Sequence, residues 1–399
     1  MTRKPRPPST EVLPPAGHRA TAEPSSVGTL ALTALIRAEI ESSPNRRISF
    51  ARYMERALYE PGLGYYQQPA NRPTDAGDFL TAPETHAIFG WTIARRIEAA
   101  WADLGRPRPF NLIEYGAGSG TLALSILEGF RRHGAAELLD VVRYAPIESN
   151  PHRRADTERR FEEAGLARSL HVAPASPSAG GTSGAEAVPV AGVLIANEFL
   201  DAMPVHRVVG RGGSLQELFV AWRGGLVEVA ADPSTPDLAA RLADDGVELA
   251  EGQVAEICLN LEPWLREVAA QLADGYALVI DYGYDAADLY GPRHLAGTLL
   301  GYRGHRIVEN PLSDPGAIDL TAHVDFTALS RLAARHGLET VSLTTQSEFL
   351  VAAGLEEELR ALQSSADLTL ADYTRARSGI VRMLDPRRMG RFRVLTLRR

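Results

Sequence analysis

Three glycines at alternate positions, Gly116, Gly118 and Gly120, form the segment of this 399-residue chain whose spacing points most directly to chemistry. They follow a short apolar run and precede a stretch with helical spacing. Glycine lets a chain turn sharply and approach a ligand closely, and the first turn of the next helix presents free N–H groups and a partial positive charge. We therefore expect a bound ligand here; the alternative is a tight turn that binds nothing.

The residues around these glycines separate three classes of ligand. A P-loop needs Gly-Lys-Ser/Thr, but Gly120 is followed by Thr121 and Leu122. The sequence therefore excludes a nucleoside triphosphate as the ligand of this turn. A dinucleotide fingerprint needs its last glycine where Thr121 stands. An acid before the glycines, Glu114, and a ribose-binding acid after the next strand, Glu148, are instead typical of S-adenosylmethionine (SAM) methyltransferases. The segment therefore favours SAM, with NAD as the alternative.

Short apolar runs that alternate with helical ones must position this turn. They predict an α/β fold, a Rossmann-like parallel sheet with helices on both faces. The predicted core strands lie at 110–116, 144–148, 169–173, 193–199 and 276–283. Two further strands are predicted at 339–346 and 391–399, and the last has no crossover helix directly before it, which predicts an antiparallel closing strand. A long helix is predicted over 255–275.

The same pattern divides the chain into regions. We expect a disordered tail over 1–27, an N-terminal helical segment over 28–109 that covers acceptor and cofactor, a core over 110–205 and 272–399, and an insertion over 206–271. The insertion contains three β-like runs between glycine-rich turns, which predict a β meander followed by a helix. A Pro/Gly/Ser-rich stretch over 173–192 predicts a mobile surface loop.

The composition of the chain limits the classes of binding partner, metal site and cellular location that we expect. The net charge of −8 and pI near 5.8 give no general attraction to nucleic acid or anionic membranes. Cys258 is the single cysteine, so an internal disulfide and a Cys-clustered zinc site are excluded, and no metal site is predicted. No apolar run approaches the roughly 20 residues of a membrane helix, and the tail has no secretory signal. These features predict a cytoplasmic protein; a homodimer stays open.

Several longer motifs make the resemblance specific. They are ISFARYMERALYEPGLGYY, GDFLTAPETHAIFG, IEYGAGSGTL, IESNP, ANEFLDAMPVHRV, VIDYG, GTLLGYRGHRI and DLTAHVDFTAL. Over about 48–349 the chain resembles the SAM-dependent methyltransferases that include the mitochondrial complex I assembly factor with protein-arginine methyltransferase activity and many bacterial relatives. The resemblance implies a class I SAM methyltransferase fold, SAM as cofactor and a protein arginine as acceptor.

The chain departs from the family pattern mainly on the acceptor side. Residues 85–87 read Thr-His-Ala in place of Ile-Ser-Gln, Trp91 stands where an acid is common, and His323 stands where Asp is usual. Asn310 lies in a segment without the usual His-Asp. These departures leave open an O- or N-methyltransferase for a small metabolite. A further alternative is a non-catalytic assembly factor, whose sign would be a broken glycine loop or a missing ribose acid, and neither is seen in the sequence.

Methyl transfer needs a lone pair aligned with the S–CH3 bond and, where required, removal of a proton. The candidate catalytic residues are Glu198, Asp201, His206, Glu84 and His86. Carboxylates would hold an arginine guanidinium, whereas a hydroxyl acceptor would favour a histidine base, for which His323 is also a candidate. The expected cofactor contacts are Tyr66, Asp78, Thr81, Glu114, Gly116, Gly118, Gly120, Glu148 and Asn197. Each acid has a helix-capping alternative, and each histidine a packing alternative.

Overall fold

The computed structural model describes residues 26–68, 81–171, 189–304, 306–365 and 368–399. The predicted tail lies outside this part, except for its last two residues, which begin helix α1 (Ser26–Ser42). The predicted surface loop over 173–192 lies outside it as far as residue 188.

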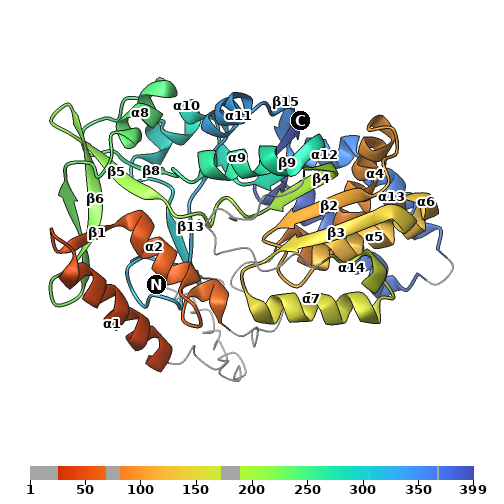
Figure 1. Ribbon diagram of the computed structural model, residues 1–399, viewed down its shortest axis with the longest axis horizontal. Coiled ribbons are helices and arrows are strands. Elements are labelled where there is room, and N and C mark those ends of the chain that lie inside the picture. The colour runs from red at the N-terminus through yellow and green to blue at the C-terminus, as the bar shows by residue number, and fades with distance from the viewer. Residues whose placement is uncertain (1–25, 69–80, 172–188, 305, 366–367) are drawn as a thin grey trace, which may run out of the picture.

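A six-stranded sheet forms the centre of the fold, in the order β15-β16-β9-β4-β2-β3 (Figure 1). Its strands are β2 (Phe110–Tyr115), β3 (Val142–Ile147), β4 (Val190–Asn197), β9 (Leu272–Asp281), β15 (Glu339–Thr345) and β16 (Arg393–Arg398). Strands β3, β2, β4 and β9 run parallel, and β16 is antiparallel to both of its neighbours. The predicted α/β sheet and its closing strand are confirmed. Of the strand predicted at 169–173, the described residues form only one bridge, between Leu170 and Tyr144.

Successive residues of the central strands face opposite sides of the sheet and build two cores. On β4, Val193 and Ile195 pack in one core, whereas Leu194 and Ala196 pack in the other. The first core is covered by α4 (Ile88–Asp103), α5 (Thr121–Arg132), α6 (Ala136–Val141), α7 (Pro151–Glu163), α12 (Gln346–Ala352), α13 (Leu355–Gln363) and α14 (Leu370–Leu384). The second is covered by α9 (Leu261–Gln271) and α11 (Phe326–Arg335). The strands are therefore buried on both faces, as a parallel sheet requires.

A second sheet stands beside the main one, on the left in Figure 1. The predicted meander is confirmed as β5 (His206–Arg211), β6 (Ser214–Trp222) and β7 (Leu226–Ala231), all antiparallel. The strand β8 (Val254–Ile257) pairs with β5, and β1 (Arg47–Ser49) pairs with β6. Helix α8 (Asp237–Asp244) packs against β5 and β8. The helix predicted over 255–275 is wrong at both ends. Its first residues pair in β8 and bury their apolar side chains there, and residues 272–275 pair with β4 as the start of β9.

The N-terminal segment divides between the two sheets. Helices α1 and α2 (Phe50–Tyr59) and the 3-10 turn η1 (Tyr65–Gln67) pack against β6 and β13 (Asp319–Thr321). The short helix α3 (Ala82–Thr85) and α4 instead pack on the main sheet. β13 pairs with β11 (Leu300–Arg303), which also pairs with β12 (Arg306–Val308). The smaller elements are β10 (Gly283–Tyr284), β14 (Val324–Asp325), α10 (Ala286–Leu289), η3 (Ala167–Ser169), η4 (Pro292–His294) and η5 (Met389–Arg391).

Candidate active site

The glycine loop joins β2 to α5. Gly116, Gly118 and Gly120 all have positive φ angles, of 66°, 55° and 74°. A Cβ atom at Gly116 would lie 2.9 Å from Phe199, and one at Gly120 would lie 2.9 Å from Thr157. Only glycine combines this backbone conformation with so little room. At Gly118 a Cβ atom would meet only the guanidinium of Arg153, in an ordinary contact at 3.7 Å, so this residue is less confined than the other two.

Glu148, the predicted ribose-binding acid, contacts this loop. One of its carboxylate oxygens accepts the N–H of Gly118 at 2.9 Å, and the other accepts the N–H of Asn150 at 2.8 Å. The Asn150 side chain caps α7 by accepting from His152, and it donates to the backbone oxygen of Tyr66 at 2.7 Å. Tyr66, the glycine loop and the second-strand acid therefore form one constellation. Each oxygen of Glu148 keeps a lone pair for a further donor such as a sugar hydroxyl.

Glu114 lies elsewhere. Its carboxylate is 6% exposed and accepts the hydroxyl of Tyr144 at 2.7 Å inside the core. Burial raises the pKa of Glu114 to about 8. The sequence placed this acid among the cofactor contacts, but its neighbours in the structure are core groups beneath the loop. Its position therefore fits support of the β2–β3 pair rather than direct contact with a ligand.

The tip of β4 holds the next group. Glu198 has a φ of 49°, a left-handed conformation that costs energy for a residue with a side chain. Its carboxylate accepts the N–H of Ala82 at 3.2 Å and the amide of Asn197 at 3.4 Å. Burial, followed by the nearby Asp201, raises the pKa of Glu198 to about 8. Asn197 keeps a buried side-chain oxygen without a hydrogen-bond partner in the part of the chain that the structure describes.

Asp281, at the end of β9, fixes the turn after Glu198. One carboxylate oxygen accepts the backbone N–H groups of Phe199, Leu200 and Asp201 at 3.1, 2.8 and 3.3 Å. Sequence reasoning did not select this residue, although the quoted strand ends at it. The signal that could have identified it is a carboxylate at the carboxyl end of a buried parallel strand.

Asp201 follows in the same turn and is 6% exposed. The hydroxyl of Tyr282 donates to one of its carboxylate oxygens. The other oxygen, Oδ1, is buried and has no hydrogen-bond partner among the described residues. Burial raises the pKa of Asp201 to about 6, while the bond from Tyr282 opposes this. The β4 tip thus gathers three acids, and within the described residues none of them is paired with a cation.

The remaining predicted residues have local partners. Asp78 lies outside the described residues. Glu84 is exposed and caps α3 by accepting the N–H of Thr81 at 3.1 Å, so the predicted catalytic acid is a helix cap. The ring of His86 accepts the N–H of Ile88 at 3.0 Å, and burial lowers its pKa, so its nitrogen is directed at the backbone rather than at a substrate.

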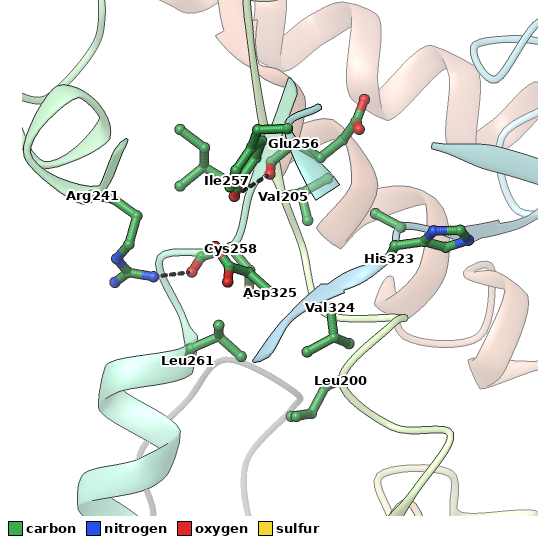
Figure 2. Close-up of a pocket in the computed structure, with 12 residues that line it drawn as sticks. Leu200, Val205, Arg241, Glu256, Ile257, Cys258, Leu261, His323, Val324 and Asp325 are labelled. Carbon is green, nitrogen blue, oxygen red and sulfur yellow. Dashed lines mark hydrogen bonds between the residues drawn. The ribbon is translucent and has the colours of Figure 1, made fainter. Parts of the chain in front are cut away.

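Two more histidines were candidates for a base. His206 lies 2.8 Å from Glu217 inside the second sheet, which accounts for its position without a substrate. His323 lines a cavity between β8, α9 and β14 (Figure 2). Burial, and then Arg391, lower the pKa of His323 to about 4. In the same cavity Arg241 donates to the backbone oxygen of Cys258 at 3.1 Å. The residues that line this cavity do not include the glycine loop.

Three comparisons bear on this site. Residues 92–344 match the model of a family described as S-adenosyl-L-methionine-dependent methyltransferases. A solved protein from Burkholderia thailandensis, bound to S-adenosyl-homocysteine, is 32% identical, covers 95% of each chain and superposes with a TM-score of 0.82. The mitochondrial protein arginine methyltransferase NDUFAF7 of Danio rerio is 28% identical over 80% of this chain and 76% of its own. Its Drosophila melanogaster homologue is 28% identical over 96% and 88%.

These comparisons confirm the predicted class I methyltransferase fold and SAM as the cofactor. They overturn the predicted cytoplasmic location, because the curated relatives are named as mitochondrial proteins. The prediction depended on the lack of an apolar run of membrane length and of a secretory signal in the tail, and neither feature assigns a compartment. The structure contains no helix, in its described part, that is long and apolar enough to cross a bilayer.

Proposed function

Because the chain belongs to the family of SAM-dependent methyltransferases, we propose that it methylates the guanidinium group of an arginine in a protein substrate. The observation that carries this proposal is the set of acids at the β4 tip, the half-buried Glu198 and the buried Asp201 and Asp281, which have no cation partner among the described residues. A guanidinium is charged at all working pH values and presents a fork of donors that matches carboxylates. The names of the NDUFAF7 relatives support the same acceptor.

The residues of the glycine loop fit SAM. Glu148 would accept the ribose hydroxyls, and Gly118, which has no side chain and only the Arg153 guanidinium near the position of a Cβ, would let the nucleoside approach. The unpartnered side-chain oxygen of Asn197 would accept the amino group of the methionine part. When bound, SAM supplies an electrophilic methyl group that can be displaced in line.

The β4 tip would orient the acceptor. Glu198 and Asp201 would bind the guanidinium in a bidentate way and hold one nitrogen toward the methyl group. An arriving cation favours the ionised form of Glu198, so its raised pKa would fall on binding. The carboxylate then stands ready to accept the proton that the methylated nitrogen releases.

The positions of the histidines support this acceptor over a metabolite hydroxyl. His86 is bonded to the backbone, His206 lies beside Glu217, and the pKa of His323 is lowered to about 4. None of the three thus has the features of a general base directed at the cofactor site. The intact glycine loop and Glu148 likewise support an enzyme over a scaffold that does not bind SAM.

The test is transfer of label from methyl-labelled SAM into proteins of a cell extract, followed by acid hydrolysis and mass spectrometry. We expect methylarginine with the parent protein. Gly118→Arg serves as the control, because its side chain would occupy the cofactor position next to Arg153. Label that stays in the small-molecule fraction, and is absent with Gly118→Arg, would move the acceptor to a metabolite.

A further inference from the structure

Helix α14 has one face packed on the rest of the fold and one face exposed to solvent. The packed face consists of Ala376, Gly379 and Met383. On the opposite face Leu370 is 81% exposed and Val381 is 59% exposed. These two positions are eleven residues apart, close to three turns, so they lie in one line along the helix. The exposed face therefore presents aliphatic surface to solvent.

Three arginines lie on the same exposed face. Arg377 falls in line with the two aliphatic residues, and Arg375 and Arg382 form the adjacent edge of the face. Arg375 pairs with Asp372 at 3.2 Å, but the two side chains remain 68% and 47% exposed. Arg377 and Arg382 have no ion pair among the described residues. Asp372 is the single acid in the helix, so the face is basic.

This face lies beside the segment that contacts Glu198. A Cβ atom at Gly379 would lie 3.0 Å from the Cβ of His86, so α14 packs directly on the end of α3. At the other end of α3, the N–H of Ala82 donates to the Glu198 carboxylate at 3.2 Å. Burial, and then the charge of Arg375, lower the pKa of His86, which agrees with a basic edge next to α3. One short helix therefore separates the basic face from the β4 tip.

An acidic protein segment complements this face better than a nucleic acid does. Carboxylates form charge-assisted hydrogen bonds with arginine, and apolar side chains of the same segment would cover the aliphatic line. A phosphate backbone offers nothing to that line, and the net charge of −8 opposes the approach of a long polyanion.

We propose that the exposed face of α14 binds an acidic segment of the protein substrate and thereby brings the target arginine to the β4 tip. The inference rests on the proposed function and adds a surface that selects the substrate at a distance from the methylated residue. Binding energy from such a remote contact can be used to position the reacting group.

The experiment uses the full chain saturated with S-adenosyl-homocysteine, and calorimetry measures peptide affinity. The first peptide is glycine-rich, with one central arginine and a segment of glutamates and leucines about ten residues to each side. Ten extended residues reach at most about 35 Å, enough to cross α3 and the width of α14. In the second peptide glutamine replaces every glutamate. In the third, citrulline, which is neutral, replaces the arginine.

The parent should bind the glutamate peptide roughly tenfold more tightly than the glutamine peptide, and the difference should shrink at about 0.5 M salt. The double variant Arg377→Glu/Arg382→Glu should lose this preference. Both side chains are exposed, so circular dichroism should show an unchanged fold. Arg211→Glu is the matched control, because Arg211 is an exposed arginine at the end of β5, in the second sheet.

The peptide pairs separate this inference from the proposed function. A parent without the glutamate preference, or a double variant that keeps it, would overturn the inference, while a preference for arginine over citrulline would still support the proposed function. Equal binding of the arginine and citrulline peptides would refute the proposed function, and the inference would fail with it. If the parent lacks the glutamate preference but binds a duplex DNA that the double variant does not, the face is a nucleic-acid surface and the inference is wrong.

Discussion

Two clusters of acids in this molecule, each with at least one buried member, differ in how their charge is balanced. Between α4, α5 and α13, Glu358 is 1% exposed and receives both Arg95 and His133, and the other ring nitrogen of His133 meets Glu98. At the β4 tip, Glu198 and Asp201 have no cation partner among the described residues. We call the first cluster matched, because its acids have cation partners, and the second unmatched. Charge pairing in the matched cluster contributes to the stability of the fold, whereas the unmatched cluster carries an electrostatic free-energy cost that a cationic ligand can relieve.

The largest effect we expect is on the unmatched side. Glu198→Gln should lower methyl transfer to arginine by about a hundredfold or more, because it removes the charge that holds the guanidinium. Glu84→Gln, at the nearby exposed helix cap, should leave the rate almost unchanged. Steady-state assays with saturating SAM measure both. Equal loss in the two variants would mean that the β4 tip has no special role.

In the matched cluster a substitution should lower the stability of the fold rather than the activity. His133→Leu leaves Glu358 with Arg95 alone and should cost roughly 1–3 kcal/mol of unfolding free energy at pH 7. Activity per folded molecule should not change. Against the effect of burial, hydrogen bonds to Glu358 and Glu98 raise the pKa of His133 to about 9.

Its contribution is therefore fully present below the unfolded pKa of about 6.5 and is lost as the pH rises through about 9. Urea unfolding of parent and variant across this range tests it. A difference that does not shrink toward pH 10 would contradict the assignment.

The pH dependence of catalysis should also distinguish the unmatched cluster from the matched one. The pKa of Glu198 is raised to about 8, so kcat/KM for an arginine peptide should rise with pH up to about 8, by close to tenfold per unit at the steepest. Binding of S-adenosyl-homocysteine over the same range should show no such limb. A flat profile would mean that Glu198 is already ionised at neutral pH.

The smallest expected effect is an increase in stability. A raised folded pKa means that the neutral form of Glu198 is preferred, so its burial is tolerated at low pH and becomes costly as the pH rises through about 8. Glu198→Gln should therefore melt roughly 1–2 °C above the parent at pH 9 and equally at pH 5. Scanning calorimetry measures the difference, which has the opposite sign to that of His133→Leu.

The sequence allowed some of this to be predicted. Alternating apolar runs were sufficient for the sheet and for its closing strand, because both depend on local pattern and strand order. That Glu148 binds the cofactor ribose remains a prediction. The start of α9 was missed, since Val254–Ile257 is apolar enough for either a strand or a helix and its pairing with β5 decides the outcome.

The acceptor side was harder to predict. Asp319 and Tyr66 lie 253 positions apart and meet because the turn η1, which carries Tyr66, packs against β13. No periodicity in either segment reports such a contact. The roles of Glu84 and His86 also depend on where their side chains point, and each was resolved by one backbone hydrogen bond.

The hydrogen bond between Leu200 and Asp281 joins residues 81 positions apart, and strands β5 to β8 of the second sheet lie between them in the chain. The turn that presents Glu198 therefore cannot be completed until β9 has docked beside β4, late in the growth of the chain. Local unfolding of β9 would likewise remove the turn that presents Glu198, while the β2–β3 pair still held the glycine loop in place. Loss of activity on mild denaturation should thus precede loss of helix content.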